Sequence, residues 1–292
     1  MSIQSIVMKV MFKRSDDERD SKIPMPVGVM CRNDISYGPS GRNNLLDVYF
    51  PENTKGTLPT IVDVHGGGYV YGSKELYRRY CMDLARRGFT VINFNYRLAP
   101  KYKFPSPLED LNAVMTWITE NADAYPVDVN RLLLAGDSAG AQLASQYAAI
   151  CSNAAYASLF HFKVPDICIR GAALNCGMYD LTREDGDKRK GILLDYLGRK
   201  VAHDDPRLNV ISAITSDFPP AYIATSANDF LRDRAEPFFN LLLKNGVPAQ
   251  YKCYGTPEQK EVAHVFHLNI IHPEAVKCND EECAFLKQYC GG

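Results

Sequence analysis

The sequence predicts an α/β fold, in which one mostly parallel, twisted sheet is flanked by helices. From about residue 43 onward, short runs rich in β-branched and aromatic residues alternate with longer amphipathic stretches. This alternation is typical of a parallel sheet that is covered on both faces. The chain has 292 residues, 46% of them hydrophobic, which is enough to bury a large core. No repeat or linker divides the sequence, so we expect a single domain over residues 1–292.

The expected strands are short runs bounded by turn residues, at 44–50, 60–66, 90–96, 131–136, 167–175, 221–227 and 249–255. The expected helices lie between or after them, at 74–87, 107–124, 138–152, 231–245 and 273–290. The earliest strand residues, at 27–38, have the spacing of a hairpin and are expected to pair antiparallel. Two segments interrupt the alternation: residues 1–26 are charged and loosely helical, and residues 178–215 are polar and well placed to cover the ends of neighbouring strands as a lid.

Composition argues against several classes of protein. The formal net charge is −1 and the basic residues are scattered, so the sequence does not predict a nucleic-acid surface. No apolar run is long enough for a membrane span and no secretory signal is recognisable, so we expect a cytoplasmic protein without a membrane partner. The nine cysteines contain no CxxC pair, and Cys278, Cys283 and Cys290 fit no common zinc pattern. We therefore expect reduced thiols, no metal site and no cofactor.

The strongest chemical signal is the pentapeptide GDSAG at 136–140, which lies between an expected strand and an expected helix. A nucleophilic serine in this position requires a strained strand-to-helix turn, and small neighbours let the backbone bend there. The start of the following helix supplies N–H groups and a positive dipole end where an anion would form. We predict that Ser138 is a nucleophile, although a serine here could also simply cap the helix.

The loop HGGGY at 65–69 follows another expected strand. Three successive glycines cost conformational entropy on folding, so their presence needs an explanation. One explanation is a loop whose backbone N–H groups must point unhindered at a ligand oxygen. We assign Gly67 and Gly68, together with Ala139 after the nucleophile, to an oxyanion hole. Tyr69 is expected to border the acyl pocket, and His65 is expected to hold the loop.

The nucleophile needs a base, and the base needs a carboxylate that orients it. His264 lies in a loop after a late strand and is the predicted base, with His267 as its main competitor. Asp229 directly follows the expected strand 221–227, at the sheet edge where ligands of α/β proteins bind, and is the predicted acid. Asp233 is expected to play a structural role beside a neighbouring arginine.

The joint pattern resembles the hormone-sensitive-lipase-like family of α/β-hydrolases, which includes many microbial esterases. The resemblance covers about residues 40–270 and rests on motifs in the family's order: HGGGY (65–69), NYRLAP (95–100), FPSPLED (104–110), GDSAG (136–140), NDFLRD (228–233) and AHVF (263–266). It implies an α/β-hydrolase fold, a triad of Ser138, Asp229 and His264, the oxyanion hole above, and a small lid built from residues 1–26 and 178–215. Val265 replaces the glycine usual after the base, and Asp63 is unexpected inside an apolar strand.

The expected function is hydrolysis of a small carboxylic ester through an acyl-serine intermediate, with a small-molecule ester as the partner. A short acyl chain is expected from the resemblance alone. Two other functions stay open: an amidase or peptidase that uses the same triad, and a catalytically silent binding protein on the same fold. A homodimer is compatible with the sequence.

Overall fold

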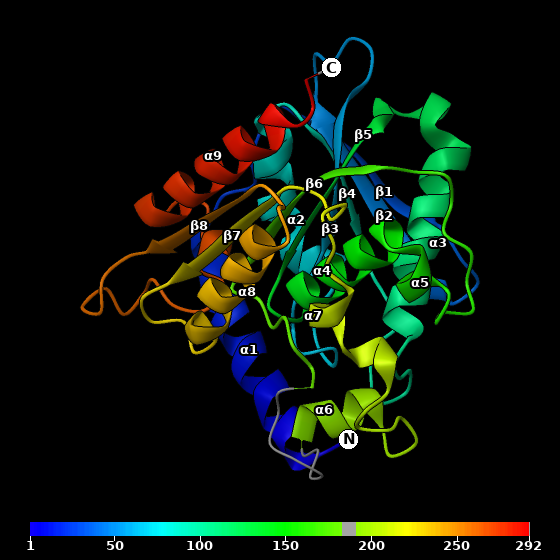
Figure 1. The fold of residues 1–292 in the computed structure, drawn as a ribbon. Helices are drawn as coiled ribbons and strands as arrows, with labels where there is room; N and C mark the ends of the chain where they lie inside the picture. The colour runs from blue at the N-terminus through cyan, green and yellow to red at the C-terminus, as the bar shows by residue number, and fades with distance from the viewer. Residues whose placement is uncertain (183–190, 292) are drawn as a thin grey trace.

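The structure is a computed structural model, and it describes residues 1–182 and 191–291. Within these residues, eight strands form one sheet in the order β1-β2-β4-β3-β5-β6-β7-β8 (Figure 1). The pairs β1–β2 and β2–β4 are antiparallel, and all later neighbours in the sheet are parallel. The predicted mostly parallel sheet with antiparallel first strands is therefore confirmed.

The strands are β1 Val29–Ser36, β2 Leu45–Pro51, β3 Leu58–Val64, β4 Thr90–Phe94, β5 Val127–Asp137, β6 Ile169–Asn175, β7 Ala221–Ser226 and β8 Ala249–Tyr254. The α-helices are α1 Ile3–Lys22, α2 Lys74–Arg86, α3 Ser106–Asn121, α4 Ala139–Ser152, α5 Ala154–Ala157, α6 Gly191–Leu197, α7 Val210–Ala213, α8 Arg232–Lys244 and α9 Pro273–Gln288. Short 3₁₀ turns lie at η1 Gly41–Asn44, η2 Ala122–Ala124, η3 Pro206–Leu208 and η4 Phe266–Leu268.

One expected strand is shorter than its sequence pattern indicates. The run at 90–96 ends as a strand at Phe94. Tyr96 leaves the sheet, and its ring stacks on that of His65 with the centroids 4.0 Å apart. The last residues of this apolar run therefore support the glycine-rich loop instead of extending β4.

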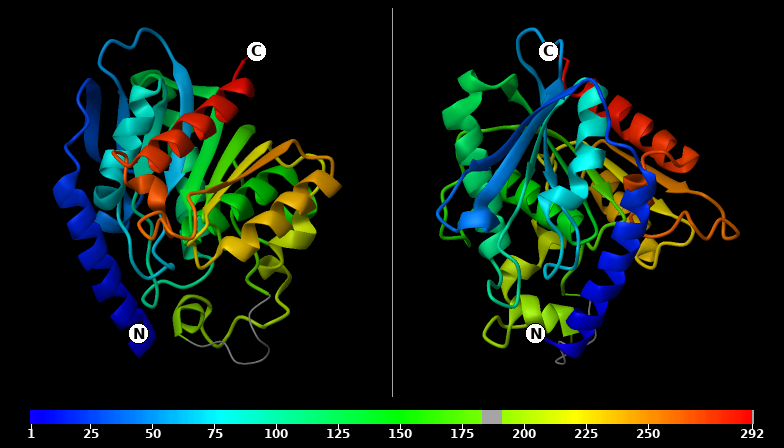
Figure 2. Two further views of the ribbon diagram at one scale, coloured as in Figure 1. Left: turned by 90° about the vertical axis from the view of Figure 1, so that its left-hand side faces the viewer. Right: turned by 180° about the vertical axis from the view of Figure 1, so that it is seen from behind.

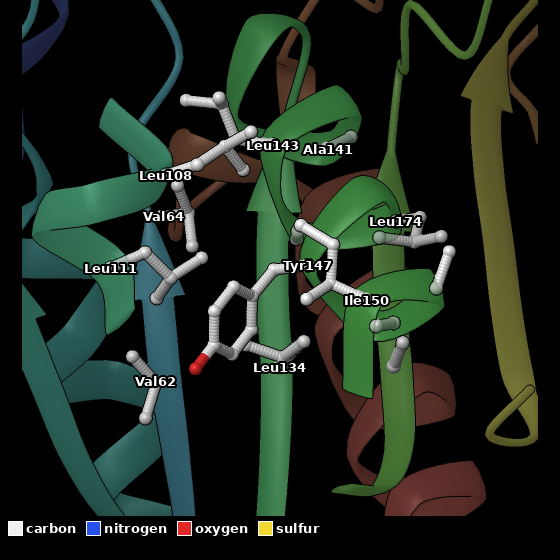
Figure 3. Packing of buried hydrophobic residues seen from close by; sticks show 14 of the residues in the cluster. Val62, Val64, Leu108, Leu111, Leu134, Ala141, Leu143, Tyr147, Ile150 and Leu174 are labelled. Atoms are coloured by element: carbon white, nitrogen blue, oxygen red, sulfur yellow. The ribbon is translucent and has the colours of Figure 1, made fainter. Parts of the chain in front are cut away.

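Helices cover both faces of the sheet, and each face has its own apolar core. Helices α3, α4 and α8 pack on one face and α2 and α9 on the other (Figures 1 and 2). Figure 3 shows the first core, where α3 and α4 place Leu111, Leu143 and Tyr147 against Val62 of β3 and Leu134 of β5. Because both faces are buried, the central strands are mostly apolar instead of alternating, with Asp63 of β3 and Asn93 of β4 as buried polar exceptions.

The N-terminal segment forms the long helix α1, which packs against α6 (Figure 2). The backbone N–H and hydroxyl of Ser2 both donate to the Asp195 carboxylate on α6, at 2.7 and 2.9 Å. The two segments expected to form a lid are thus joined, although part of the second, residues 183–190, lies outside the described residues. Among the helices described, none has the length and apolar character needed to cross a bilayer.

Candidate active site

Ser138 occupies the sharp turn between β5 and α4. Its backbone has φ 52° and ψ −117°, a conformation that L-residues rarely adopt and that is costly to hold. The Ser138 N–H donates to the Asn175 carbonyl at 2.9 Å and so fixes the turn. A side chain at Gly140 would place its Cβ 1.9 Å from the Val64 carbonyl oxygen, so only glycine lets α4 pack this close to β3. The turn therefore has the geometry that the GDSAG pattern predicts.

A continuous line of hydrogen bonds joins Ser138 to His264 and Asp229. His264 Nε2 lies 3.0 Å from Ser138 Oγ, and His264 Nδ1 lies 2.7 Å from an oxygen of Asp229. Asp229 lies three residues after the end of β7 at Ser226, and a bridge between Asn228 and Ala263 brings the two loops together. If Nδ1 carries the proton and donates to the carboxylate, Nε2 is left as an acceptor for the serine hydroxyl proton.

The environment of Asp229 keeps its carboxylate ionised. Burial alone would raise its pKa, but the hydrogen bond and charge interaction with His264 outweigh burial and lower the pKa. The Leu231 N–H, at 2.9 Å, and the Thr225 hydroxyl, at 2.8 Å, also donate to this carboxylate. A negative group fixed in this way orients the imidazole and stabilises its protonated form.

The competing histidine and aspartate lie elsewhere. His267 is buried against the edge of the Tyr80 ring, and burial lowers its pKa to about 3. The Asp233 side chain is 91% exposed and lies beside Arg232. Of the alternatives considered from the sequence, the structure brings only His264 and Asp229 to Ser138.

The glycine-rich loop is held by His65, as the sequence predicts. His65 Nδ1 lies 2.8 Å from the Gly66 carbonyl oxygen, and burial lowers the pKa of this histidine to about 4, so the ring is neutral at pH 7. Gly67 has φ +106°, and a Cβ there would lie 2.3 Å from the Tyr71 carbonyl oxygen. Ala139 is the first residue of α4, so its N–H has no acceptor within the helix.

A cavity of about 300 Å³ opens beside Ser138. Its lining includes Gly67 and His264 from the predicted site. The rest of the lining comes from α1, from the segment after the glycine-rich loop and from the loops around the acid and the base: Met11, Phe12, Ser15, Asp16, Gly66, Tyr71, Gly72, Tyr77, Asp137, Phe230, Ala263, Val265 and Leu268. The site therefore combines an apolar wall with a few polar groups.

Tyr69 and Gly68 lie outside the lining of this cavity. The Tyr69 ring is buried and stacked on Tyr196, with the centroids 3.9 Å apart, and its hydroxyl donates to Gln142 at 3.1 Å. A Cβ at Gly68 would contact Met8 of α1. This position differs from the expectation that Tyr69 borders the acyl pocket, because its positive φ of 64° turns the side chain toward α4 and α6. The tyrosines and phenylalanines that line the cavity are instead Phe12, Tyr71, Tyr77 and Phe230.

A buried tyrosine connects the glycine-rich loop to the nucleophile turn. The Tyr77 hydroxyl accepts from the Gly66 N–H at 2.8 Å and donates to the Asp137 carboxylate at 2.7 Å. Burial raises the pKa of Asp137 to about 6, even though the hydrogen bond from Tyr77 lowers it. The sequence analysis missed this link, because nothing in the spacing of α2 relates it to either loop.

The two departures from the family pattern have structural explanations. Val265 has φ 55°, the left-handed conformation that explains why glycine is usual after the base. Asp63 is fully buried on β3, with one oxygen 3.3 Å from Cys81 Sγ, and burial raises its pKa well above the usual value. Burial therefore favours the neutral form of the Asp63 carboxyl over its ionised form.

The fold and the serine turn define an α/β-hydrolase. A family model described as alpha/beta hydrolase fold matches residues 61–268, and the chain belongs to this family. The resemblance to hormone-sensitive-lipase-like hydrolases that was drawn from the motifs is thereby confirmed.

Relatives and structural neighbours are esterases. The chain is 32% identical over 219 residues to acetyl esterases of Salmonella paratyphi B and Salmonella agona, a match that covers 71% of this chain and 66% of the relatives. The chain thus spans just under two thirds of the length of these relatives. Esterase B of Lactobacillus rhamnosis, in a crystal structure with a tributyrin phosphonate, has a TM-score of 0.90 at 26% identity, covering 98% of this chain and 94% of that one. A hyperthermophilic esterase of the archaeon Pyrobaculum calidifontis has a TM-score of 0.74 at 26% identity, covering 98% and 92%.

Proposed function

We propose that this protein is a serine carboxylesterase that hydrolyses short-chain acyl esters. The observation that carries the proposal is the hydrogen-bonded line from Ser138 through His264 to Asp229, beside a cavity. The esterase relatives support it. A silent binding protein would not require all three groups to be present in this arrangement.

In the proposed acylation step, Ser138 Oγ attacks the ester carbonyl carbon while His264 Nε2 accepts the hydroxyl proton. Asp229 stabilises the imidazolium that forms. The backbone N–H groups of Gly67, Gly68 and Ala139 are proposed to donate to the negative oxygen of the tetrahedral intermediate. His264 then protonates the leaving alcohol, and the acyl group remains on the serine.

Deacylation repeats these steps with water as the nucleophile. His264 Nε2 accepts a proton from the water as it attacks the acyl carbon, and then returns a proton to Ser138 Oγ as the carboxylic acid leaves. All proton transfers pass through one imidazole, so the position of that ring is the main requirement for the reaction.

We propose that α1 and residues 178–215 act as a small lid on a single domain and limit the size of the acyl group. Met11 and Phe12 of α1 and Phe230 beside the acid supply apolar surface to the cavity. A volume of about 300 Å³ is at the lower end for ligand sites and suits a small ester. The tributyrin phosphonate of the Lactobacillus rhamnosis esterase agrees with a short acyl chain.

A panel of p-nitrophenyl esters from acetate to palmitate, with the matched p-nitroanilides, tests this function. We expect the highest kcat/KM at two to about four acyl carbons, little anilide turnover, and loss of several orders of magnitude of ester turnover in Ser138→Ala. Preference for the anilides would favour an amidase. Wild-type protein that hydrolyses none of these compounds would refute the proposal.

One observation favours a second candidate, an esterase that acts at a lipid–water interface. Several apolar side chains of α1 are exposed at helical spacing and continue to the cavity at Met11: Ile3, Ile6, Val7, Val10 and Met11. An exposed apolar stripe of this kind is unusual unless it has a partner. A jump in rate when tributyrin exceeds its solubility limit would support this candidate, and a smooth saturation curve would oppose it.

We also propose that the protein resides in a reducing compartment, such as the cytoplasm. All nine cysteines are free thiols, and the five buried ones are Cys81, Cys176, Cys278, Cys283 and Cys290. Buried thiols of this kind behave as small apolar side chains and are typical of proteins that are kept reduced.

A further inference from the structure

Cys176 lies directly behind the proposed acid and base. It follows the last residue of β6, its side chain is buried, and its N–H donates to the Ala224 carbonyl at 2.7 Å. Its φ of 49° is unfavourable for a residue with a side chain. Such strain persists only where the surrounding structure holds it, and it is concentrated near functional sites.

The Cys176 thiol completes a cluster of three metal-ligating groups. One ligand atom each from Cys176, Asp229 and His264 lies within 4.8 Å of the other two, and this is the one such group found in the part of the chain that the structure describes. The thiol also hydrogen-bonds with the Asp229 carboxylate and accepts from the Val265 N–H. In the ester-hydrolysing state, Cys176 is thus one more donor to the carboxylate that orients the base.

We propose that Cys176, Asp229 and His264 Nδ1 bind a thiophilic divalent ion, Zn²⁺ or Cd²⁺, and that this ion switches the esterase off. Sulfur, imidazole nitrogen and carboxylate oxygen are the ligands that zinc prefers, and three of them plus one water make a four-coordinate site. Bond lengths of about 2.0–2.3 Å in a tetrahedral site require ligand atoms roughly 3.4–3.6 Å apart. The existing separations, all within 4.8 Å, need only small side-chain movements to reach this geometry.

Inhibition follows from the protons that the ion displaces. The Cys176 thiol releases its proton to solvent and binds as thiolate, and the His264 proton moves from Nδ1 to Nε2 so that Nδ1 can bind the ion. Nε2 then donates toward Ser138 Oγ, 3.0 Å away, and no longer accepts its proton. The ion therefore removes the general base without occupying the ester cavity. This inhibition rests on the proposed esterase mechanism, whereas binding of the ion does not.

The test compares full-length wild-type protein with Cys176→Ser, which keeps a hydroxyl donor to Asp229 but loses the sulfur ligand. Ester turnover is measured in rising ZnCl₂ and CdCl₂, and EDTA is added afterwards. We expect reversible inhibition of the wild type, and in Cys176→Ser a half-inhibiting concentration, measured against that variant's own uninhibited rate, that is at least about tenfold higher. Cys168→Ser, which removes an exposed thiol, should match the wild type.

Binding is measured separately with CoCl₂, through the near-ultraviolet absorption of a cobalt–thiolate bond. We expect this band in the wild type and in the inactive Ser138→Ala, and its loss in both Cys176→Ser and Cys176→Ala. The band shows whether Cys176 binds the metal ion even if the wild type lacks esterase activity. If Cys176→Ser does not fold, Cys176→Ala is used in its place. An equal cobalt band in wild type and both Cys176 variants, or equal zinc inhibition, would overturn the proposal.

Discussion

Substitution of Tyr77 by phenylalanine should impair catalysis through a residue outside the proposed triad. The Tyr77 hydroxyl accepts from the Gly66 N–H of the glycine-rich loop and donates to the Asp137 carboxylate of the nucleophile turn. Tyr77→Phe removes the hydroxyl and keeps the ring. The Gly66 N–H then loses this acceptor and keeps only its hydrogen bond to the Asp137 carboxylate, so Gly67, which follows it, is less firmly positioned.

The magnitude follows from the two lost hydrogen bonds. A typical hydrogen bond contributes about 0.5–1.5 kcal/mol, and a hydrogen bond to a charged group contributes about 1.5–3 kcal/mol. We therefore expect the unfolding free energy of Tyr77→Phe to fall by about 2–4 kcal/mol. Complete removal of an oxyanion donor costs roughly a hundredfold to a thousandfold in kcat, so a misplaced donor should cost about tenfold to a hundredfold.

The matched control is Tyr80→Phe on the same helix. The Tyr80 hydroxyl is equally buried and also donates to a carboxylate, Glu282, at 2.8 Å, but it does not contact either loop. Urea unfolding should show a loss of about 1.5–3 kcal/mol in this variant, whereas kcat on p-nitrophenyl acetate stays within about twofold of the wild type. Equal kcat values for Tyr77→Phe and Tyr80→Phe would refute the assigned positioning role.

Three further predictions concern neighbouring residues. Asp229→Asn should lower kcat by about ten-thousandfold while the fold is retained, because the tautomer of the base is no longer set; an effect below tenfold on ester turnover would contradict this. Val265→Gly should be more stable to urea than Val265→Ala by roughly 0.5–1 kcal/mol, because alanine keeps the left-handed strain that glycine relieves; the reverse order would contradict the strain. Burial raises the pKa of Glu282 from 4.5 to about 7, so its stabilising effect is full below pH 4.5 and is lost as pH rises through about 7. The unfolding free energy of the wild type should therefore fall by about 3 kcal/mol over that range relative to Glu282→Gln, whereas equal pH profiles would contradict the shift.

The sequence predicted the elements whose signals are local. GDSAG marks a turn that demands small neighbours on both sides of Ser138, and Gly140 indeed leaves no room for a side chain. The positions of Asp229 and His264, each after a late strand, made them candidates, because parallel strands bring their carboxyl ends to one edge; His267 stayed open as a competitor, and the family resemblance favoured His264. The sheet and its helices followed from the alternation of short and long apolar patterns.

The parts that the sequence did not predict depend on tertiary contacts. Met11 and Phe12 reach the cavity because α1 packs beside it; the resemblance implied an N-terminal lid, but no pattern in the first residues indicates which side chains face the cavity. Tyr69 points away from the cavity because of one backbone angle, and Tyr71, two residues further on, lies there instead. Phe230 directly follows the predicted acid, and this position next to the motif was the one sequence signal that it could line the cavity.

Covalent labelling tests the central claim most directly, namely that His264 makes the Ser138 hydroxyl reactive. Full-length wild type, Ser138→Ala, His264→Ala and the neighbouring His267→Ala are treated with a fluorophosphonate, and the adduct is located by intact mass and peptide mapping. The account predicts one adduct per chain, on Ser138, formed rapidly in the wild type, absent in Ser138→Ala and slowed by several orders of magnitude in His264→Ala. An adduct on another residue, or rapid labelling of His264→Ala together with slow labelling of His267→Ala, would contradict it.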